Sequence, residues 1–254
     1  MAITIKSERE IELMAEAGKI LERVHNELEK ALHPGMSTKD IDTLGEKIIR
    51  SYGCIPSFLN YNGYPASICV SVNQEVVHGI PDKHRIIHEA DIVSLDAGVI
   101  YKGYHSDAAR THAVGEVSEE AKKLIQVTKE CFFEGIKYAK AGNHLFDISG
   151  AIGRYAEERG YGVVRDLCGH GIGTALHEAP EIPNYEVGRK GVKLRPGMTL
   201  AIEPMINIGT YEVDWLDDDW TVVTRDGSLS AHYENTILIT EGEPRILSLT
   251  CDNE

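Results

Sequence analysis

The feature that most constrains how this chain can fold is an internal repeat. The segment Pro34–Ile41, which leads to Gly53, resembles the segment Ala141–Ile148, which leads to Gly160, and corresponding residues are 107 positions apart. A glycine, a capping residue and an acid in the first turn are also general features of helix starts. The repeat gains weight because paired strand segments follow each copy, and repeated units tend to pack around a shared core.

The sequence predicts two helices at the start of each half. Ser7 and Glu10 form a capping box before apolar residues at helical spacing. Ser37 caps a second helix, which ends at Gly53. The same pattern recurs in the second half, where the first helix is predicted over 118–140.

Two strands that each carry an acid follow in the first half. Asp96 and Asp107 lie in apolar segments separated by a turn next to Gly103. If the two acids face each other across an antiparallel hairpin, the turn centres between Tyr101 and Lys102. Like charges so placed repel each other unless a cation lies between them.

A longer hairpin is predicted in the second half. Opposition of Glu203 and Glu234 would centre its turn on Asp218–Asp219. The predicted fold class is therefore α+β: a single domain of two pseudo-symmetric helix-helix-hairpin halves, about 1–115 and 116–254, around a central antiparallel sheet.

Four acids and one histidine within strand-like segments are candidate metal ligands: Asp96, Asp107, His170, Glu203 and Glu234. Their apolar neighbours argue against four unrelated surface acids, because a buried charge is costly unless it is paired or metal-bound. Glycines on both sides of His170 allow a close approach to a metal. This oxygen-rich set suits Mn²⁺, Fe²⁺ or Co²⁺, with Zn²⁺ as a further option. Four carboxylates balance two divalent ions, a pair that supports hydrolysis.

Composition excludes several other classes. The 254 residues are 42% hydrophobic, which is enough for a sizeable core. A net charge of −14 opposes nucleic-acid binding, and no sequence-specific nucleic-acid partner is expected. The five cysteines form no Cys-x-x-Cys pair, which favours reduced thiols in the cytoplasm. No segment is long and apolar enough to cross a membrane, so we expect a cytoplasmic protein with no membrane partner. A monomer is a separate expectation, which nothing in the sequence decides.

Several motifs, in the right order, resemble those of bacterial type I methionine aminopeptidases, a family with the pita-bread fold. The resemblance covers nearly the whole chain and lies in five segments: Tyr64–Asn73, Val76–Pro81, Gly169–Glu178, Pro196–Pro204 and Leu229–Glu234. It implies removal of the initiator methionine from nascent proteins when the second residue is small.

The resemblance also implies roles for the candidate ligands. Asp96 and Asp107 would bind one metal ion, Asp107 and Glu234 would bridge both ions, and His170 with Glu203 would complete the second site. A bridging hydroxide would attack the scissile carbonyl while Glu203 assists proton transfer.

Two further histidines acquire roles from the same resemblance. His177 would donate a hydrogen bond to the carbonyl oxygen, and His78 would contact the peptide nitrogen. The residues alone leave open that both are structural histidines with satisfied hydrogen bonds.

By resemblance, a pocket for the methionine side chain is walled by Phe58, Tyr61, Tyr64, Cys69, His78, Leu176, His177 and Trp220. Without the family, the aromatic residues between Phe58 and Tyr64 describe only a loop that buries apolar area. Leu167 and Leu176 occupy positions where many relatives carry aromatic residues, which leaves the width of the pocket open.

Two alternatives remain: a hydrolase of X-Pro peptides on the same fold, or a pita-bread binding module without catalysis. X-Pro relatives usually carry an additional amino-terminal domain, for which the helix cap at Ser7 leaves no room, and the intact ligand set disfavours the binding module. The enzyme is also expected to remove its own Met1, which precedes Ala2.

The resemblance implies transient docking on the ribosome. Five lysines expected on one helix are the candidate patch, although a solvated helix face is the preferred interpretation: Lys122, Lys123, Lys129, Lys137 and Lys140.

Overall fold

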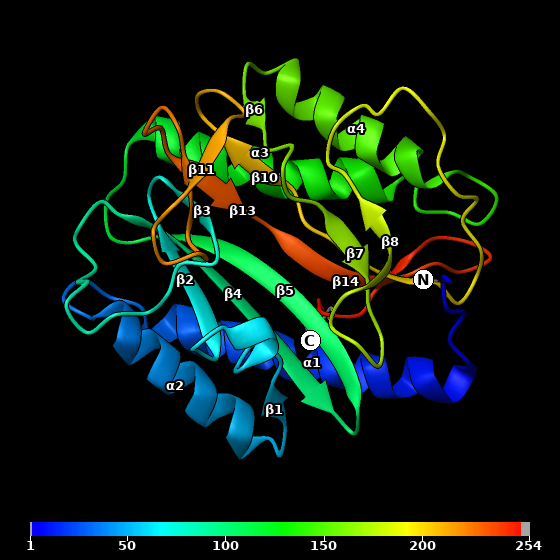
Figure 1. Cartoon of the computed structure of the whole chain (residues 1–254), viewed down its shortest axis with the longest axis horizontal. Coiled ribbons are helices and arrows are strands. Elements are labelled where there is room, and N and C mark those ends of the chain that lie inside the picture. Colours follow the sequence, from blue (N-terminus) through cyan, green and yellow to red (C-terminus); the bar gives the residue numbers. More distant parts are fainter. Residues whose placement is uncertain (1, 250–254) are drawn as a thin grey trace.

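The computed structural model describes residues 2–249. The predicted removal of Met1 and the fifth cysteine, Cys251, lie outside the described residues. Four α-helices and antiparallel strands make up this part of the chain, which confirms the predicted α+β class (Figure 1). No helix among residues 2–249 is both long enough and apolar enough to cross a membrane.

The first two helices are α1 (Glu8–Ala31) and α2 (Thr38–Ser51). Both begin with a capping box, in which a serine hydroxyl accepts a backbone N–H and the acid three residues later accepts the serine N–H: Ser7 with Glu10, as predicted, and Ser37 with Asp40, where only the serine cap was predicted. The apolar stripe of α1 is buried, as its spacing predicts, and includes Met14, Leu21 and Leu28.

The second half contains α3 (Glu119–Ile136) and α4 (Leu145–Glu157). The prediction that the first of these helices reaches Lys140 is wrong. After Ile136 the amides of Tyr138 and Ala139 bond to carbonyls only three residues earlier, so the chain tightens into turns and the helix ends.

The main sheet has nine strands in the order β1-β4-β5-β14-β9-β7-β8, with β2 also paired to β4 and β15 to β14. All of these pairs are antiparallel. The strands are β1 (Ile55–Pro56), β2 (Ile68–Val72), β4 (Ile92–Tyr101), β5 (Tyr104–Ala113), β7 (Gly169–Gly171), β8 (Glu178–Ile182), β9 (Thr199–Ile202), β14 (Glu234–Leu238) and β15 (Arg245–Ile246).

Two three-stranded sheets extend from the main one, in the orders β13-β10-β6 and β11-β12-β3. Their strands are β3 (Glu75–Val77), β6 (Gly162–Val163), β10 (Met205–Asn207), β11 (Val213–Trp215), β12 (Val222–Thr224) and β13 (Ser230–His232).

The hairpin of β4 and β5 differs from its prediction in register. Asp107 pairs with Gly98 and Asp96 pairs with Ala109, so the two acids lie diagonally on one face instead of directly opposite. The turn is the two-residue link Lys102–Gly103, both with positive φ (49° and 86°), which suits the right-handed twist of the strands. The prediction assumed that the two acids pair directly. Two residues can bind the same metal ion whenever they point to the same face of the sheet, so direct pairing is not required.

The long hairpin of the second half has the register that the sequence predicts. Direct opposition of Glu203 and Glu234 gives the same alignment as the pairs Ile202–Asn235 and Met205–His232. The alignment continues through β11 and β12, where Trp215 pairs with Val222. The turn therefore falls at Asp218–Asp219, although the hairpin passes through three separate sheets.

The two halves repeat each other in hydrogen bonding. Gly35 and Gly142 both have a φ of 94°, and their amides donate to Ile87 and Leu194. The bridges Ser37–Ile86 and His144–Lys193 correspond in the same way. Every one of these pairs is offset by 107 residues, so the sequence repeat is also a structural repeat.

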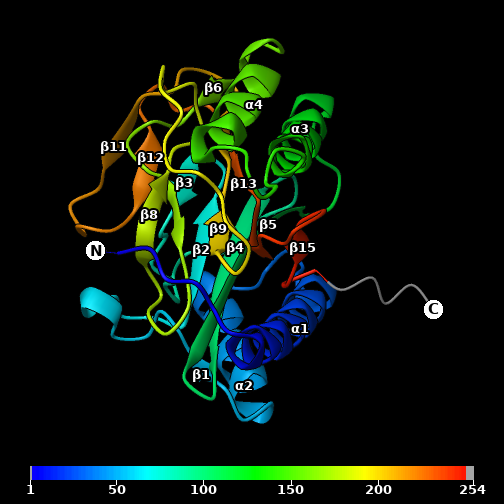
Figure 2. The ribbon, with the colours of Figure 1, turned by 90° about the vertical axis from the view of Figure 1, so that its right-hand side faces the viewer.

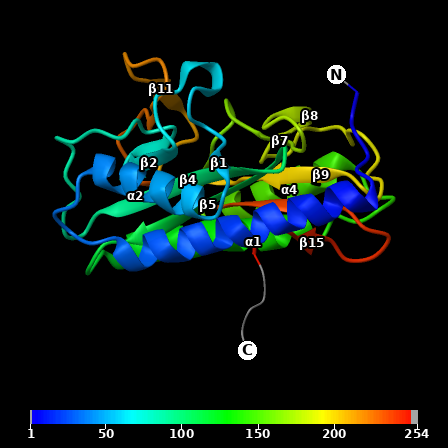
Figure 3. The ribbon, with the colours of Figure 1, turned by 90° about the horizontal axis from the view of Figure 1, so that it is seen from below.

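The helices lie on one side of the strands. Figure 2 shows α1 and α3 on one side, with β8 and β11 on the other, and Figure 3 shows α1 running along the underside of β4 and β5. Each half has its own apolar core, one between α1, α2 and strands β2, β4 and β5, and the other around α3 and α4. The candidate site residues occupy the face away from α1 and α3.

Candidate metal centre

Five neighbouring strands of the main sheet bring the five candidate ligands together. In the spatial order β4, β5, β14, β9 and β7, these strands carry or border Asp96, Asp107, Glu234, Glu203 and His170. Because the strands are adjacent and the acids share one face, residues far apart in the sequence line a single cavity.

Three of these residues form a compact group. Asp107, His170 and Glu234 are all buried, and each offers a ligand atom within 4.8 Å of the others. Nε2 of His170 lies 3.9 Å from Oδ2 of Asp107 and 3.5 Å from Oε1 of Glu203. Asp96 lines the same cavity. One or two cations at this position would have oxygen and nitrogen ligands on several sides.

The hydrogen bond that His170 makes determines which of its nitrogens can bind a metal. Its Nδ1 lies 2.9 Å from the carbonyl oxygen of Gly171, which only accepts, so Nδ1 carries the proton. Nε2 is then left with a free lone pair toward the acids. Burial first, and the neighbouring His177 second, lower the pKa of His170 to about 3, so the imidazole is neutral.

The four carboxyl groups are electrostatically unfavourable without a cation. Burial raises the pKa of Asp96 to about 7, and burial with mutual repulsion raises the pKa of Asp107 and Glu234. Burial, with the charge of Asp96, also raises the pKa of Glu203. One oxygen each of Asp96, Asp107 and Glu234 is buried without a hydrogen-bond partner among residues 2–249. Such oxygens are the ligands that divalent cations bind, so the residues fit a metal centre.

Glu203 does not lie within a strand, contrary to the prediction. β9 ends at Ile202, and the following Pro204 has no N–H to continue the ladder. The carbonyl of Glu203 accepts a hydrogen bond of 3.1 Å from the side chain of Asn184. The break turns this carboxylate into the cavity next to His170.

An apolar pocket opens beside the acids. Together they line a cavity of about 120 Å³. All eight residues predicted for the pocket border it: Phe58, Tyr61, Tyr64, Cys69, His78, Leu176, His177 and Trp220. Cys69 pairs with Asp96 across β2 and β4, so the pocket wall and the acid cluster share a strand pair. The volume suits one side chain, since pockets for drug-sized ligands measure roughly 300–1,000 Å³.

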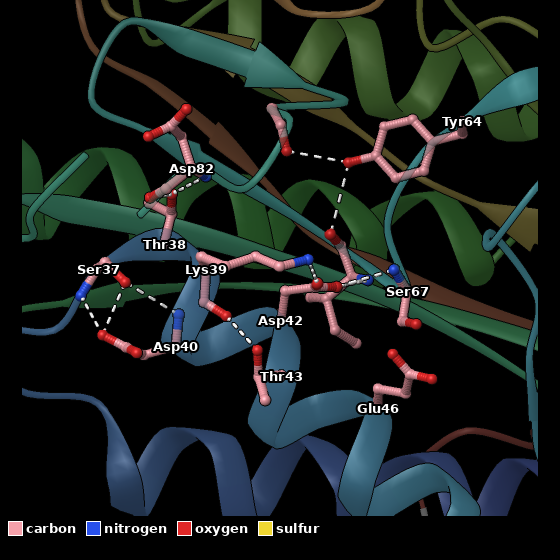
Figure 4. Close-up of polar contacts among 12 residues, drawn as sticks. Ser37, Thr38, Lys39, Asp40, Asp42, Thr43, Glu46, Tyr64, Ser67 and Asp82 are labelled. Atoms are coloured by element: carbon pink, nitrogen blue, oxygen red, sulfur yellow. Dashed lines mark hydrogen bonds and ion pairs between the residues drawn. The ribbon is translucent and has the colours of Figure 1, made fainter. Parts of the chain in front are cut away.

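Hydrogen bonds between side chains and the backbone hold the wall of this pocket in place (Figure 4). The Tyr64 hydroxyl donates to the carbonyl of Gly79 over 3.0 Å, which anchors the ring. Asp42 of α2 accepts from the amides of Ser67 and Ile68 and pairs with Lys39 at 2.6 Å. These bonds fix the start of β2, the strand that carries Cys69.

Two histidines lie where the pocket meets the acids. The rings of His177 and His170 are 4.3 Å apart, and Nδ1 of His177 is 2.9 Å from the hydroxyl of Tyr61. His78 has a positive φ of 59° and contacts the ring of Trp220. Burial lowers the pKa of both histidines, that of His78 to about 4.

A groove continues outward from the same centre. It measures about 670 Å³ and shares His78, His170, His177 and Glu203 with the smaller pocket. Leu167 lines this groove and not the apolar pocket, so of the two leucines only Leu176 sets the pocket's width.

Two further residues lie at the site without having been predicted from the sequence. Asn62 borders the pocket from the short 3-10 helix η1 (Tyr61–Gly63), in the left-handed conformation that an Asn-Gly pair favours. His232 lies 3.9 Å from Glu203, and its place two residues before Glu234 was the available signal.

The residues from 12 to 241 match the model of metallopeptidase family M24. Together with the acid and histidine cluster, this match defines the class: the chain belongs to metallopeptidase family M24.

The relatives that it resembles are more specific in name. It is 58% identical to a protein of Clostridium acetobutylicum named methionine aminopeptidase, over 97% of this chain and 99% of that one. A crystal structure of methionine aminopeptidase from Thermotoga maritima superimposes with a TM-score of 0.96 at 46% identity, over 98% of this chain and 100% of that one. An Xaa-Pro dipeptidase from Bacillus anthracis has the same fold, with a TM-score of 0.77 at 27% identity. The match covers 97% of this chain but only 62% of that protein.

The five predicted lysines do not form one helical patch. α3 ends at Ile136, before two of them. Three are held in ion pairs of 2.5–2.8 Å with nearby acids: Lys122 with Glu119, Lys137 with Glu134, and Lys140 with Glu243. Docking on the ribosome stays a prediction.

Proposed function

We propose that the protein removes the initiator methionine from polypeptides whose second residue is small, using two divalent metal ions. The observation that carries this proposal is a small, largely apolar pocket that ends directly at a cluster of buried acids and one neutral imidazole. A substrate held there by its first side chain would present its first peptide bond to the cluster. The names of the relatives at up to 58% identity support the same activity.

In this proposal Asp96 and Asp107 would hold one ion, Asp107 and Glu234 would be shared by both ions, and His170 and Glu203 would complete the second site. The unpaired oxygens of Asp96, Asp107 and Glu234 and the free Nε2 of His170 support this assignment. The oxygen-rich set favours Mn²⁺, Fe²⁺ or Co²⁺ over the thiolate-rich sites typical of structural Zn²⁺. When bound, such ions polarise a carbonyl oxygen and activate water for hydrolysis.

The remaining side chains position the peptide and move protons. Glu203 accepts and returns a proton at its carboxylate. The Tyr61 hydroxyl donates to Nδ1 of His177, so that Nε2–H of His177 is free to donate to the carbonyl oxygen as negative charge develops. His78 contacts the peptide nitrogen. The groove that begins at these residues takes the continuing chain.

Hydrolysis of three peptides by chelator-stripped protein tests the proposal, before and after Mn²⁺, Co²⁺ or Fe²⁺ is added back without oxygen. We expect metal-dependent release of methionine from Met-Ala-Ser and little release from Met-Leu-Ser. Cleavage of Ala-Pro-Ala alone would move the assignment to X-Pro hydrolysis. Absence of turnover with every metal would favour the binding module.

A further inference from the structure

His232 is a buried histidine without a hydrogen-bond partner for its ring. It is only 2% exposed, yet neither Nδ1 nor Nε2 has a partner among the described residues. Buried polar side chains are hydrogen-bonded in most native structures, so an imidazole with two unpaired nitrogens calls for a specific explanation.

The group that faces this ring is the Glu203 carboxylate. Nε2 of His232 lies 3.9 Å from Oε2 of Glu203, while Oε1 of the same carboxylate lies 3.5 Å from Nε2 of His170. A carboxylate oxygen only accepts hydrogen bonds, so a bond between the two groups requires the proton of His232 to be on this nitrogen. A small rotation of the Glu203 side chain brings the pair into hydrogen-bonding range.

The backbone of His232 is held rigidly. Its N–H donates to Oγ1 of Thr111 and its carbonyl accepts from the same hydroxyl, both over 2.9 Å. The Thr111 hydroxyl also contacts that of Ser94 at 2.8 Å. The pairing of Met205 with His232 places Glu203 diagonally on the neighbouring segment, within reach of a long side chain.

His232 also borders a second cavity, separate from the proposed metal centre. This cavity measures about 390 Å³, and His25, Arg110 and Lys129 line it as well. It contains none of the proposed metal ligands. The link of His232 to the centre is therefore its contact with Glu203, the one proposed ligand that is also the proposed proton carrier.

We infer that His232 is a positioning residue for Glu203. Its Nε2–H donates to Oε2 and holds the carboxylate so that Oε1 stays on the side of His170. Without this bond the carboxylate rotates, and both its metal ligation and its proton transfer suffer. The inference rests on the proposed function for its catalytic consequence, but its effect on metal binding is independent of that function.

Two variants and a control test this role. His232→Leu fills the space without a donor, and His232→Gln keeps an N–H that can reach the carboxylate. His25→Gln is the matched control, because His25 is 4% exposed, lines the same cavity and bonds to the carbonyl of Ala108 instead. Calorimetric titration of the metal-free proteins with Mn²⁺ and steady-state kinetics on Met-Ala-Ser are the measurements.

We expect His232→Leu to weaken Mn²⁺ affinity roughly 10–100-fold, as the loss of a hydrogen bond to a metal ligand typically does. Its kcat should fall while KM changes less than about 2-fold, because the pocket walls are untouched. His232→Gln should restore both quantities to within a few-fold of the wild type, and the His25 control should match the wild type.

A double-mutant cycle separates this role from simple packing. In a Glu203→Ala background, which removes the acceptor, His232→Leu should weaken Mn²⁺ binding no further, because its target is gone. Additive effects, or wild-type Mn²⁺ affinity in His232→Leu, would overturn the inference. If His232→Leu does not fold, His232→Asn, which is too short to reach Glu203, replaces it. A wild type that binds Mn²⁺ but releases no methionine would contradict the proposed function and not the inference about His232. The Mn²⁺ affinities of the double-mutant cycle would still test that inference.

Discussion

The two hairpins that supply the acids are built differently. β4 and β5 are ten-residue strands paired without interruption around a two-residue turn. The hairpin between Glu203 and Glu234 keeps its register but is broken at Pro204 and Tyr233 and passes through three sheets. The regular hairpin fixes two proposed ligands within continuous strands. The broken one frees Glu203 from its strand and places His232 3.9 Å from its carboxylate, which suits the proton transfer proposed for Glu203.

Loss of a ligand on the regular hairpin should have the largest effect. Asp107→Asn removes the charge proposed to be shared by both ions. It should cost several kcal/mol of transition-state stabilisation, roughly 10³-fold in kcat/KM. Metal content by atomic emission should fall together with activity, while circular dichroism stays unchanged. Glu116→Gln, an exposed acid just after β5, is the control. Turnover retained in Asp107→Asn would contradict the dinuclear scheme.

A smaller effect is expected on the broken hairpin. Glu203→Gln keeps the shape of the side chain but cannot accept a proton, so kcat should fall roughly 10²–10³-fold. Steady-state kinetics at saturating Mn²⁺ compares it with Asp107→Asn. If only KM changes, Glu203 binds substrate and does not transfer protons. The break in its hairpin would then be unrelated to proton transfer.

A buried histidine in α1, which packs against the regular hairpin, should make the stability of the protein depend on pH. Burial lowers the pKa of His25 well below 6.5, so below pH 6.5 the unfolded chain binds a proton that the folded protein does not. The contribution of His25 to the free energy of unfolding is therefore fully present above pH 6.5 and is lost as the pH falls below it. Between pH 7 and pH 5 the loss is roughly 1–2 kcal/mol. Urea unfolding of the Mn²⁺-saturated protein should show this slope reduced in His25→Gln. Parallel pH profiles for the two proteins would contradict the neutral state of His25.

The smallest effects concern the two turns. Gly103 and Asp219 both have positive φ, 86° and 63°. Gly103→Ala should destabilise the protein by about 1 kcal/mol, because alanine is strained in this conformation, whereas Asp219→Gly should be neutral or slightly stabilising. Thermal melts measure both, with kcat unchanged. The reverse result, in which Asp219→Gly lowers the melting temperature and Gly103→Ala does not, would mean that side-chain contacts at the turns outweigh backbone strain.

The sequence predicted the arrangement of elements better than the details of the site. Helix caps at Ser7 and Ser37 and the alignment of Glu203 with Glu234 followed from local chemistry and from residue spacing. The alignment of Asp96 with Asp107 did not, because residues that share a ligand role need only the same face. The role of His232 was hidden as well, since its importance depends on a distance to Glu203 that no local pattern encodes.

Cellular location, oligomeric state and the particular metal stay predictions from composition and family. The cysteines at positions 54, 69, 131 and 168 are free thiols in the described part of the chain. Oligomeric state is best tested by light scattering of the Mn²⁺-bound protein.

The order of ligands across the main sheet has a consequence for assembly. Strands from the first half supply Asp96 and Asp107, and strands from the second supply the rest, with the boundary between halves at the junction of β5 and β14. Neither half, expressed alone, would hold all five proposed ligands, and a one-residue slip at that seam would turn proposed ligands toward the helices. Metal affinity thus reports whether the two halves have docked in register, and titration during refolding would time that event independently of helix formation.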